Sequence, residues 1–158
     1  MSRNMQSNID ATIIQQLLSD SEKDGIQKLV VGAVIYKNSK FLLLERVLSD
    51  SMGGLVELPS GTVDTDESLL TALAREIQEE TGLLVTSVLE YLGCFDYTSS
   101  SGERTRQFNF FVEVEVGEIK LSPTEHQAYH LVALSDVAFT TLNISDATKE
   151  ILKTAAQQ

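Results

Sequence analysis

The stretch GTVDTDESLLTALAREIQEETGL, residues 61–83, predicts the helix around which the fold is built. Its apolar positions recur at helical spacing and are Leu69, Leu70, Leu73 and Ile77. A stripe of this kind packs on a hydrophobic core. We expect the helix to run from Glu67 to Thr81, with an N-cap among residues 64–66 and a C-cap glycine at Gly82.

The same helix carries three glutamates on one face. Glu76, Glu79 and Glu80 stand at i, i+3 and i+4, so their side chains are neighbours. Like charges at this spacing cost about 0.2–0.5 kcal/mol per pair. A cation between them would remove that cost, and hard ions such as Mg²⁺ prefer oxygen ligands. The pattern predicts a metal site; the alternative is a solvated charged face.

Strand patterns lie on both sides of this helix. Before it, an apolar β-branched run, a four-residue turn and a second apolar run indicate a hairpin, and period-two alternation follows it. The expected strands are 28–36, 41–46, 56–58, 84–97, 108–116 and 128–134, and a C-terminal helix is expected at 144–156. This order predicts an α/β fold with a central mixed sheet between helices.

Residues 1–27 form an N-terminal extension to the domain predicted for residues 28–158. Apolar residues from Ile9 onward repeat at helical spacing, which predicts a helix capped by Asn8 or Asp10. This helix could pack on the domain or on a second subunit.

Composition narrows the range of partners and compartments. The 158 residues are 42% hydrophobic, enough for a domain with a real core, and 12 basic against 23 acidic side chains give a net charge of −11. We therefore expect no nucleic acid as a partner. The single cysteine, Cys94, excludes an internal disulfide. The sequence has neither an apolar run of about 18 residues nor a leader pattern, so we expect no membrane span and a cytoplasmic location.

The segment from Gly61 to Leu83 resembles the signature of the Nudix hydrolases. The matching positions are Gly61, five residues, Glu67, seven residues, Arg75-Glu76-Ile77, one residue, Glu79-Glu80, one residue and Gly82-Leu83. The resemblance implies an α/β/α sandwich over residues 28–158. It also implies hydrolysis of a nucleoside diphosphate linked to another group, with Mg²⁺ or Mn²⁺ bound by the glutamates at 76, 79 and 80.

The resemblance leaves the catalytic base open. Family members place the base either within the motif or on a later loop, so that Glu79 and Glu125 are both candidates here. Arg75, four residues before Glu79, is expected to orient that carboxylate. Glu67 is expected either to stabilise the positive end of the helix dipole or to support the loop near the metal.

The expected substrate contacts are Arg46, Glu57 and Gly61. A guanidinium at the end of a strand can bind two phosphate oxygens, and Gly61 would let the backbone approach the phosphates closely. The run from Glu57 to Gly61 (ELPSG) is similar to the Glu-Leu-Pro-Ala-Gly run of nucleoside-diphosphate-sugar pyrophosphatases, which favours an ADP-ribose-like substrate. That subgroup has a proline downstream where this chain has Ser99, so a nucleoside triphosphate stays an alternative.

Two further alternatives concern the class of protein and its assembly. A Nudix-fold module could sense a nucleotide without cleaving it, although the retention of all three motif glutamates favours an enzyme. The family also includes many dimers, so a homodimer is one expected assembly. His126 and His130 are not expected to bind a metal, because residues i and i+4 of a strand lie about 13 Å apart.

Overall fold

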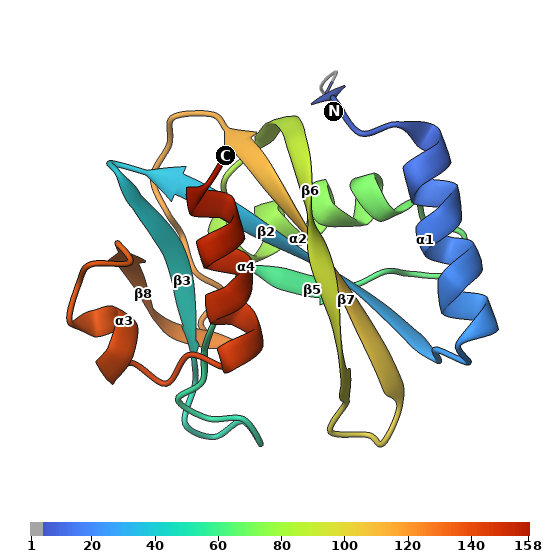
Figure 1. The fold of residues 1–158 in the computed structure, drawn as a ribbon. Helices are drawn as coiled ribbons and strands as arrows, with labels where there is room; N and C mark the ends of the chain where they lie inside the picture. Colours follow the sequence, from blue (N-terminus) through green and yellow to red (C-terminus); the bar gives the residue numbers. More distant parts are fainter. Residues whose placement is uncertain (1–4) are drawn as a thin grey trace.

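The predicted central sheet is present and lies between helices (Figure 1). The computed structural model describes residues 5–158. In chain order its elements are β1 Gln6–Ser7, α1 Ala11–Lys23, β2 Lys28–Lys37, β3 Lys40–Arg46, β4 Val56–Glu57, β5 Ser60–Thr62, α2 Leu69–Thr81, β6 Val85–Thr98, β7 Arg104–Val114, β8 His126–Val132, α3 Ala138–Thr141 and α4 Asp146–Ala156. None of the described helices is long and apolar enough to cross a membrane.

Strand β2 is the centre of the mixed sheet. It pairs in parallel with β7 and antiparallel with both β3 and β5. The strand order is β1-β6-β7-β2-β3-β4, and β8 adds to β3. Val31 and Ala33 of β2 face one hydrophobic cluster and Val34 faces the other, so both sides of the strand are buried. A continuous apolar run is typical of such a strand.

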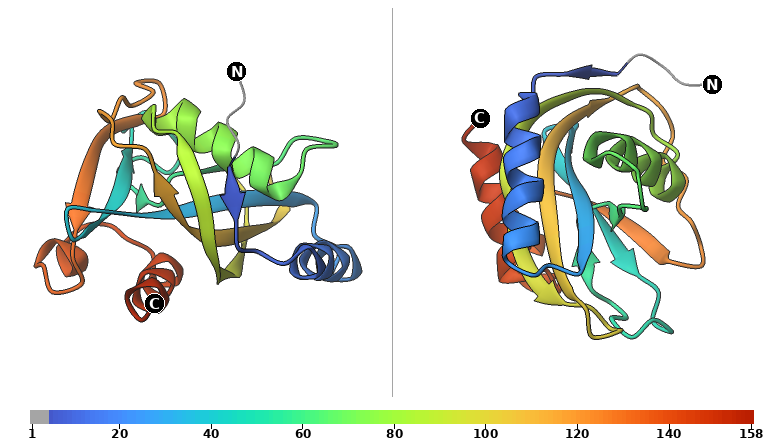
Figure 2. Two further views of the ribbon diagram at one scale, coloured as in Figure 1. Left: turned by 90° about the horizontal axis from the view of Figure 1, so that it is seen from above. Right: turned by 90° about the vertical axis from the view of Figure 1, so that its right-hand side faces the viewer.

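Helix α2 covers one face of this sheet (Figure 2). Its predicted apolar stripe is confirmed, because Leu69, Leu73 and Ile77 are at most 1% exposed. The predicted start of the helix at Glu67 is wrong by two residues: Ser68 is the N-cap and accepts a hydrogen bond from the backbone N–H of Thr71. Asp64, Thr65 and Asp66 therefore belong to the preceding loop.

Helix α4 covers the opposite face, as the right-hand view of Figure 2 shows. Its Ile151 and Leu152 pack with Val34 and Leu43 in the second cluster. Ser145 caps this helix and fixes its start two residues later than predicted. Together with α2 on the other face, α4 completes the predicted α/β/α arrangement.

Helix α1 lies near the start of β2 (Figure 1). Asp10 caps it, one of the two predicted caps, and Ile14 and Leu17 pack partly against the first cluster. The first four residues of the predicted extension lie outside the described residues. The short elements β1, β5 and α3 were not predicted, because two to four residues are too few to show a period.

Candidate active site

Glu80 is the most enclosed carboxylate of the predicted metal site. It is 5% exposed, and its Oε1 accepts a hydrogen bond from the backbone N–H of Ser60 at 2.8 Å. Burial, and to a smaller degree the nearby charges of Glu57, Glu125 and Glu76, raise the pKa of Glu80 to about 9. Four carboxylates from three parts of the chain therefore converge on one region.

Glu76 reaches this region through a gap that only glycine leaves open. A Cβ atom at Gly61 would overlap the carboxyl carbon and Oε2 of Glu76. Gly61 was predicted to let the backbone approach phosphates, whereas in the structure its open side is occupied by the Glu76 carboxylate. Burial raises the pKa of Glu76, against the opposing effect of Arg75.

Arg75 forms hydrogen bonds with glutamates at both ends of the motif. Its Nε and Nη2 donate to the two oxygens of Glu67 at 2.7 and 2.8 Å. Its Nη1 donates to Glu76 at 2.9 Å and to Glu79 at 3.1 Å, so the predicted pair between Arg75 and Glu79 is present. Hydrogen bonds from Arg75 lower the pKa of Glu67 to about 2. Glu67, in the loop before α2, thus fixes the position of the Arg75 guanidinium through two hydrogen bonds.

The donor set of this face fits a hard divalent ion. Glu76, Glu79 and Glu80 offer carboxylate oxygens, the ligands that Mg²⁺ prefers, and a cation would offset the charges that oppose ionisation of Glu80. Within residues 5–158 no three acidic, histidine or cysteine side chains are already arranged around a metal position. Binding would therefore require the carboxylates of Glu76 and Glu79 to turn away from Arg75.

The loop before β8 brings Glu125 to the same region. Its charge contributes to the raised pKa of both Glu76 and Glu80, so its carboxylate lies near α2. The loop is fixed at its backbone, because the carbonyl of Glu125 accepts from the N–H of Val47 at 3.0 Å. The side chain is exposed. The candidate base outside the motif is thus close to the motif in space.

Two predicted substrate contacts, Arg46 and Glu57, are paired with each other. Arg46 Nε lies 3.0 Å from Oε2 of Glu57, and Nη1 lies 3.1 Å from Asp50. His126 Nε2 is also 3.0 Å from the same oxygen of Glu57. Sequence reasoning missed this role of His126, since no local pattern relates two residues that are 69 positions apart.

His130, four residues after His126 on β8, makes an equivalent contact. Its Nε2 lies 2.9 Å from Oε1 of Glu45 on β3. The two histidines therefore bind separate carboxylates, Glu57 and Glu45. Partial burial and, to a smaller degree, the charge of Glu57 raise the pKa of Tyr97, which is 41% exposed.

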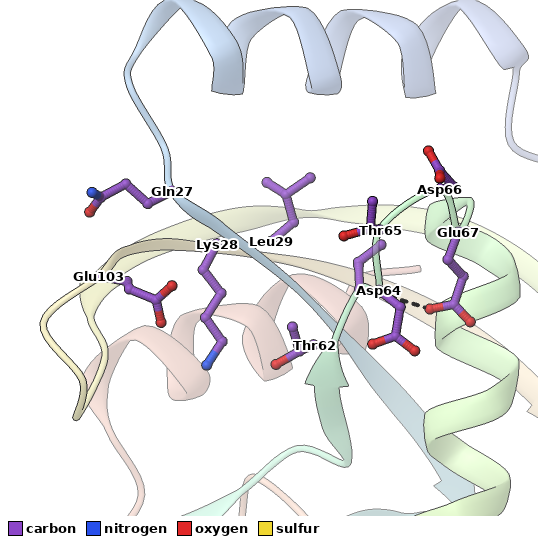
Figure 3. A pocket seen from close by; sticks show the side chains of 10 residues that line it. Gln27, Lys28, Leu29, Thr62, Asp64, Thr65, Asp66, Glu67 and Glu103 are labelled. Atoms are coloured by element: carbon purple, nitrogen blue, oxygen red, sulfur yellow. Dashed lines mark hydrogen bonds between the residues drawn. The ribbon is translucent and has the colours of Figure 1, made fainter.

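A cavity of about 530 Å³ lies on the other side of the loop that precedes α2 (Figure 3). Its lining residues are Gln27, Lys28, Leu29, Thr62, Val63, Asp64, Thr65, Asp66, Glu67 and Glu103. Lys28 alone among them is basic, against four carboxylates. A cavity with this charge does not suit a diphosphate. Two of its lining residues, Thr62 and Glu67, also accept hydrogen bonds from Arg75.

Comparisons with known proteins agree with this geometry. A family model described as NUDIX domain matches residues 27–154. The chain is 43% identical over 63 residues to the CTP pyrophosphohydrolase of Escherichia coli K12, covering 40% of this chain and 46% of the relative. It is 32% identical over 118 residues to the ADP-ribose pyrophosphatase of Methanocaldococcus jannaschii, covering 70% of this chain and 66% of the relative. Each match thus spans less than two thirds of the relative's own length.

A solved structure extends the likeness to the fold. The MutT NUDIX hydrolase from Burkholderia pseudomallei superposes with a TM-score of 0.69 at 27% sequence identity. The match covers 80% of this chain and 96% of that chain. The similarity therefore reaches well beyond the motif to the sheet and helices that support it.

Proposed function

The chain belongs to the NUDIX domain family, and on that premise we propose that it is a metal-dependent pyrophosphohydrolase of nucleotides. The proposed reaction is cleavage of the diphosphate linkage of a nucleoside diphosphate derivative by attack of water on phosphorus. The observation that supports it most is the convergence of carboxylates from α2, β4 and the loop before β8 on the buried Glu80. Such a site is suited to Mg²⁺ or Mn²⁺ and not to an isolated anion.

The residues present would divide the chemistry between them. When bound, a divalent ion held by Glu76, Glu79 and Glu80 supplies charge neutralisation at the diphosphate and lowers the pKa of water. The backbone N–H of Ser60 keeps the Glu80 carboxylate in one orientation. Arg75, which is bound to Glu67, donates to Glu76 and Glu79 and would release their carboxylates to the ion on binding.

Glu125 is our choice for the base that accepts the proton of the attacking water. Arg75 Nη1 donates to both oxygens of Glu79, so both oxygens of that carboxylate already have a hydrogen-bond partner. The carboxylate of Glu125 has no hydrogen-bond or ion-pair partner within the described part of the chain and lies near the same carboxylates. A Glu125→Gln variant that keeps its metal affinity but loses the acidic limb of kcat against pH, where protonation of the base stops turnover, would support this choice; an unchanged profile would favour Glu79.

The relatives indicate the general class of substrate, a nucleotide with a diphosphate linkage, but not one compound. The relatives named above act on CTP and on ADP-ribose, a nucleoside triphosphate and a nucleotide sugar. Both contain the proposed diphosphate linkage. The ELPSG run favours the nucleotide sugar, and Arg46, with Glu57 beside it, is the proposed contact to the substrate.

A substrate screen tests the proposal directly. Purified protein would be incubated with CTP, 8-oxo-dGTP or ADP-ribose and Mg²⁺ or Mn²⁺, and the products identified. We expect turnover that a chelator abolishes and that Glu80→Gln removes. Glu113→Gln, an exposed glutamate of β7, is the matched control. If no nucleotide is cleaved but one raises the melting temperature, the chain is a sensor and the proposal fails.

A further inference from the structure

His126, at the start of β8, is a buried polar residue for which the proposed reaction has no role. It is 2% exposed, and Nε2 of its ring lies 3.0 Å from Oε2 of Glu57. Nδ1 is also buried and has no hydrogen-bond partner within residues 5–158. An unpaired buried nitrogen is costly. An apolar side chain would avoid that cost, so the contact with Glu57 is the evident reason for a histidine here.

Two side chains hold the carboxylate of Glu57, and both reach the same oxygen, Oε2. Arg46 forms an ion pair with it through Nε at 3.0 Å, and His126 adds a side-chain hydrogen bond at 3.0 Å. Because Oε2 also pairs with the guanidinium of Arg46, we take it as the acceptor and Nε2–H of His126 as the donor. No hydrogen bond or ion pair from a described side chain reaches Oε1 of Glu57. This oxygen is left as an acceptor in a side chain that is 17% exposed.

The position of Glu57 connects this acceptor to the proposed site. Ser60, three residues further along, donates its backbone N–H to Glu80. The segment from Glu57 to Ser60 is therefore hydrogen-bonded at one end to His126 of β8 and at the other end to Glu80 of α2. The charge of Glu57 also raises the pKa of Tyr97, whose ring centroid lies 6.2 Å from that of Phe95. Aromatic rings within reach of the charge of a carboxylate add stacking to a hydrogen-bond acceptor.

We propose that His126 is a positioning residue for substrate recognition. By donating Nε2–H to Glu57, it holds Oε1 toward an N–H or O–H group on the nucleoside part of the substrate. This inference rests on the proposed function, because it requires that a nucleotide binds over the carboxylates of α2. A nucleotide that offers a donor should bind more tightly than its counterpart without one, since an unpaired buried acceptor is costly.

The test replaces His126 by Leu, Asn and Gln. Leucine removes the donor, asparagine is too short to reach Glu57, and the amide of glutamine can take the place of Nε2–H. His130→Leu is the matched control, because His130 binds Glu45 on the same pair of strands at 2.9 Å. For each variant, kcat and KM would be measured, together with the melting temperature and the affinity of the nucleotide-free protein for Mn²⁺ by electron paramagnetic resonance.

We expect KM to rise about tenfold in His126→Leu, the effect of one charge-assisted hydrogen bond, with kcat within about threefold of the wild type. Glutamine should restore most of the loss, and Mn²⁺ affinity should not change. His130→Leu should keep the wild-type KM. If the leucine variant does not fold, the asparagine variant provides the same comparison. A change of KM below twofold in a folded variant, or equal losses with glutamine and leucine, would overturn the inference.

A double-mutant cycle with Glu57→Gln tests whether His126 acts through Glu57. The tenfold effect of His126→Leu should disappear in the Glu57→Gln background, and an undiminished effect would contradict the positioning role. A fall in Mn²⁺ affinity in place of the KM effect would also contradict it. If the wild-type protein cleaves no nucleotide, the proposed function fails by itself. Equilibrium dissociation constants for the same nucleotides would then test His126 separately.

Discussion

The carboxylate face of α2 and the meeting point of β3, β4 and β8 are built in opposite ways. The α2 face takes Arg75, Glu76, Glu79 and Glu80 from six consecutive positions of one helix. The other region takes Arg46, Glu57 and His126 from three strands, with contacts that span up to 69 residues. The first set is fixed by helix geometry, whereas the second depends on the assembled sheet.

This difference suggests a division of labour between the two regions. A rigid helix keeps the spacing of its carboxylates under most changes elsewhere, which suits groups that hold a metal. Residues at strand ends and loops can vary without loss of the helix, which suits recognition of different substrates. We therefore expect substitutions on α2 to change kcat and substitutions at the strand ends to change KM.

The largest effect is expected from removing a carboxylate of α2. Glu80→Gln or Glu79→Gln should lower kcat by at least about a thousandfold, because each removes a proposed ligand of the ion that stabilises the transition state. Circular dichroism should show the fold retained. Full Mg²⁺-dependent turnover by both folded variants would remove the metal-site hypothesis and with it the proposed division.

A smaller loss is expected when the helix is intact but its carboxylate is displaced. In Gly61→Ala the new methyl group would overlap the Glu76 carboxylate, so that the side chain must move. A shift of about 1 Å can cost about a hundredfold in rate. Gly117→Ala is the matched control, because a Cβ there meets its nearest atom at 3.8 Å. Equal kcat values for the two variants would show that the position of Glu76 is unimportant.

The strand-end region should respond differently. Arg46→Lys keeps the charge but cannot reach Glu57 and Asp50 together in the planar geometry of a guanidinium. We expect KM to rise about five- to tenfold while kcat changes little. Arg104→Lys, at the start of β7, is the control. A fall in kcat as large as that of Gly61→Ala would mean that the two regions act as one site.

The same contrast explains how much the sequence could predict. The stripe of α2, its C-cap Gly82 and the pair Arg75–Glu79 follow from helical spacing, which is local. The N-cap was misplaced because Asp64, Thr65 and Asp66 are all good capping residues and spacing does not distinguish them from Ser68. The contact of His126 with Glu57 depends on both strands pairing with β3, and no pattern of either strand contains that information.

The smallest effect concerns the stability of the metal-free protein. It tests whether the carboxylates of α2 need a cation to be ionised. The pKa of Glu80 is raised from 4.5 to about 9, chiefly by burial. Between these values the folded protein keeps a proton that the unfolded chain releases, so stability must fall as pH rises. Glu80→Gln lacks this proton and should not share that fall.

The melting temperatures of Glu80→Gln and the wild type should therefore be compared at pH 5 and pH 9 in the presence of a chelator. The melting temperature of the variant minus that of the wild type should be higher at pH 9 than at pH 5 by at least about 3 °C. Glu113→Gln should run parallel to the wild type. Added Mg²⁺ should reduce the pH dependence of the wild type and of Glu113→Gln but not of Glu80→Gln, because an ion bound to ionised Glu80 replaces the proton. Parallel curves for all three proteins would mean that Glu80 ionises freely, and the buried carboxylate would then be no argument for a bound cation.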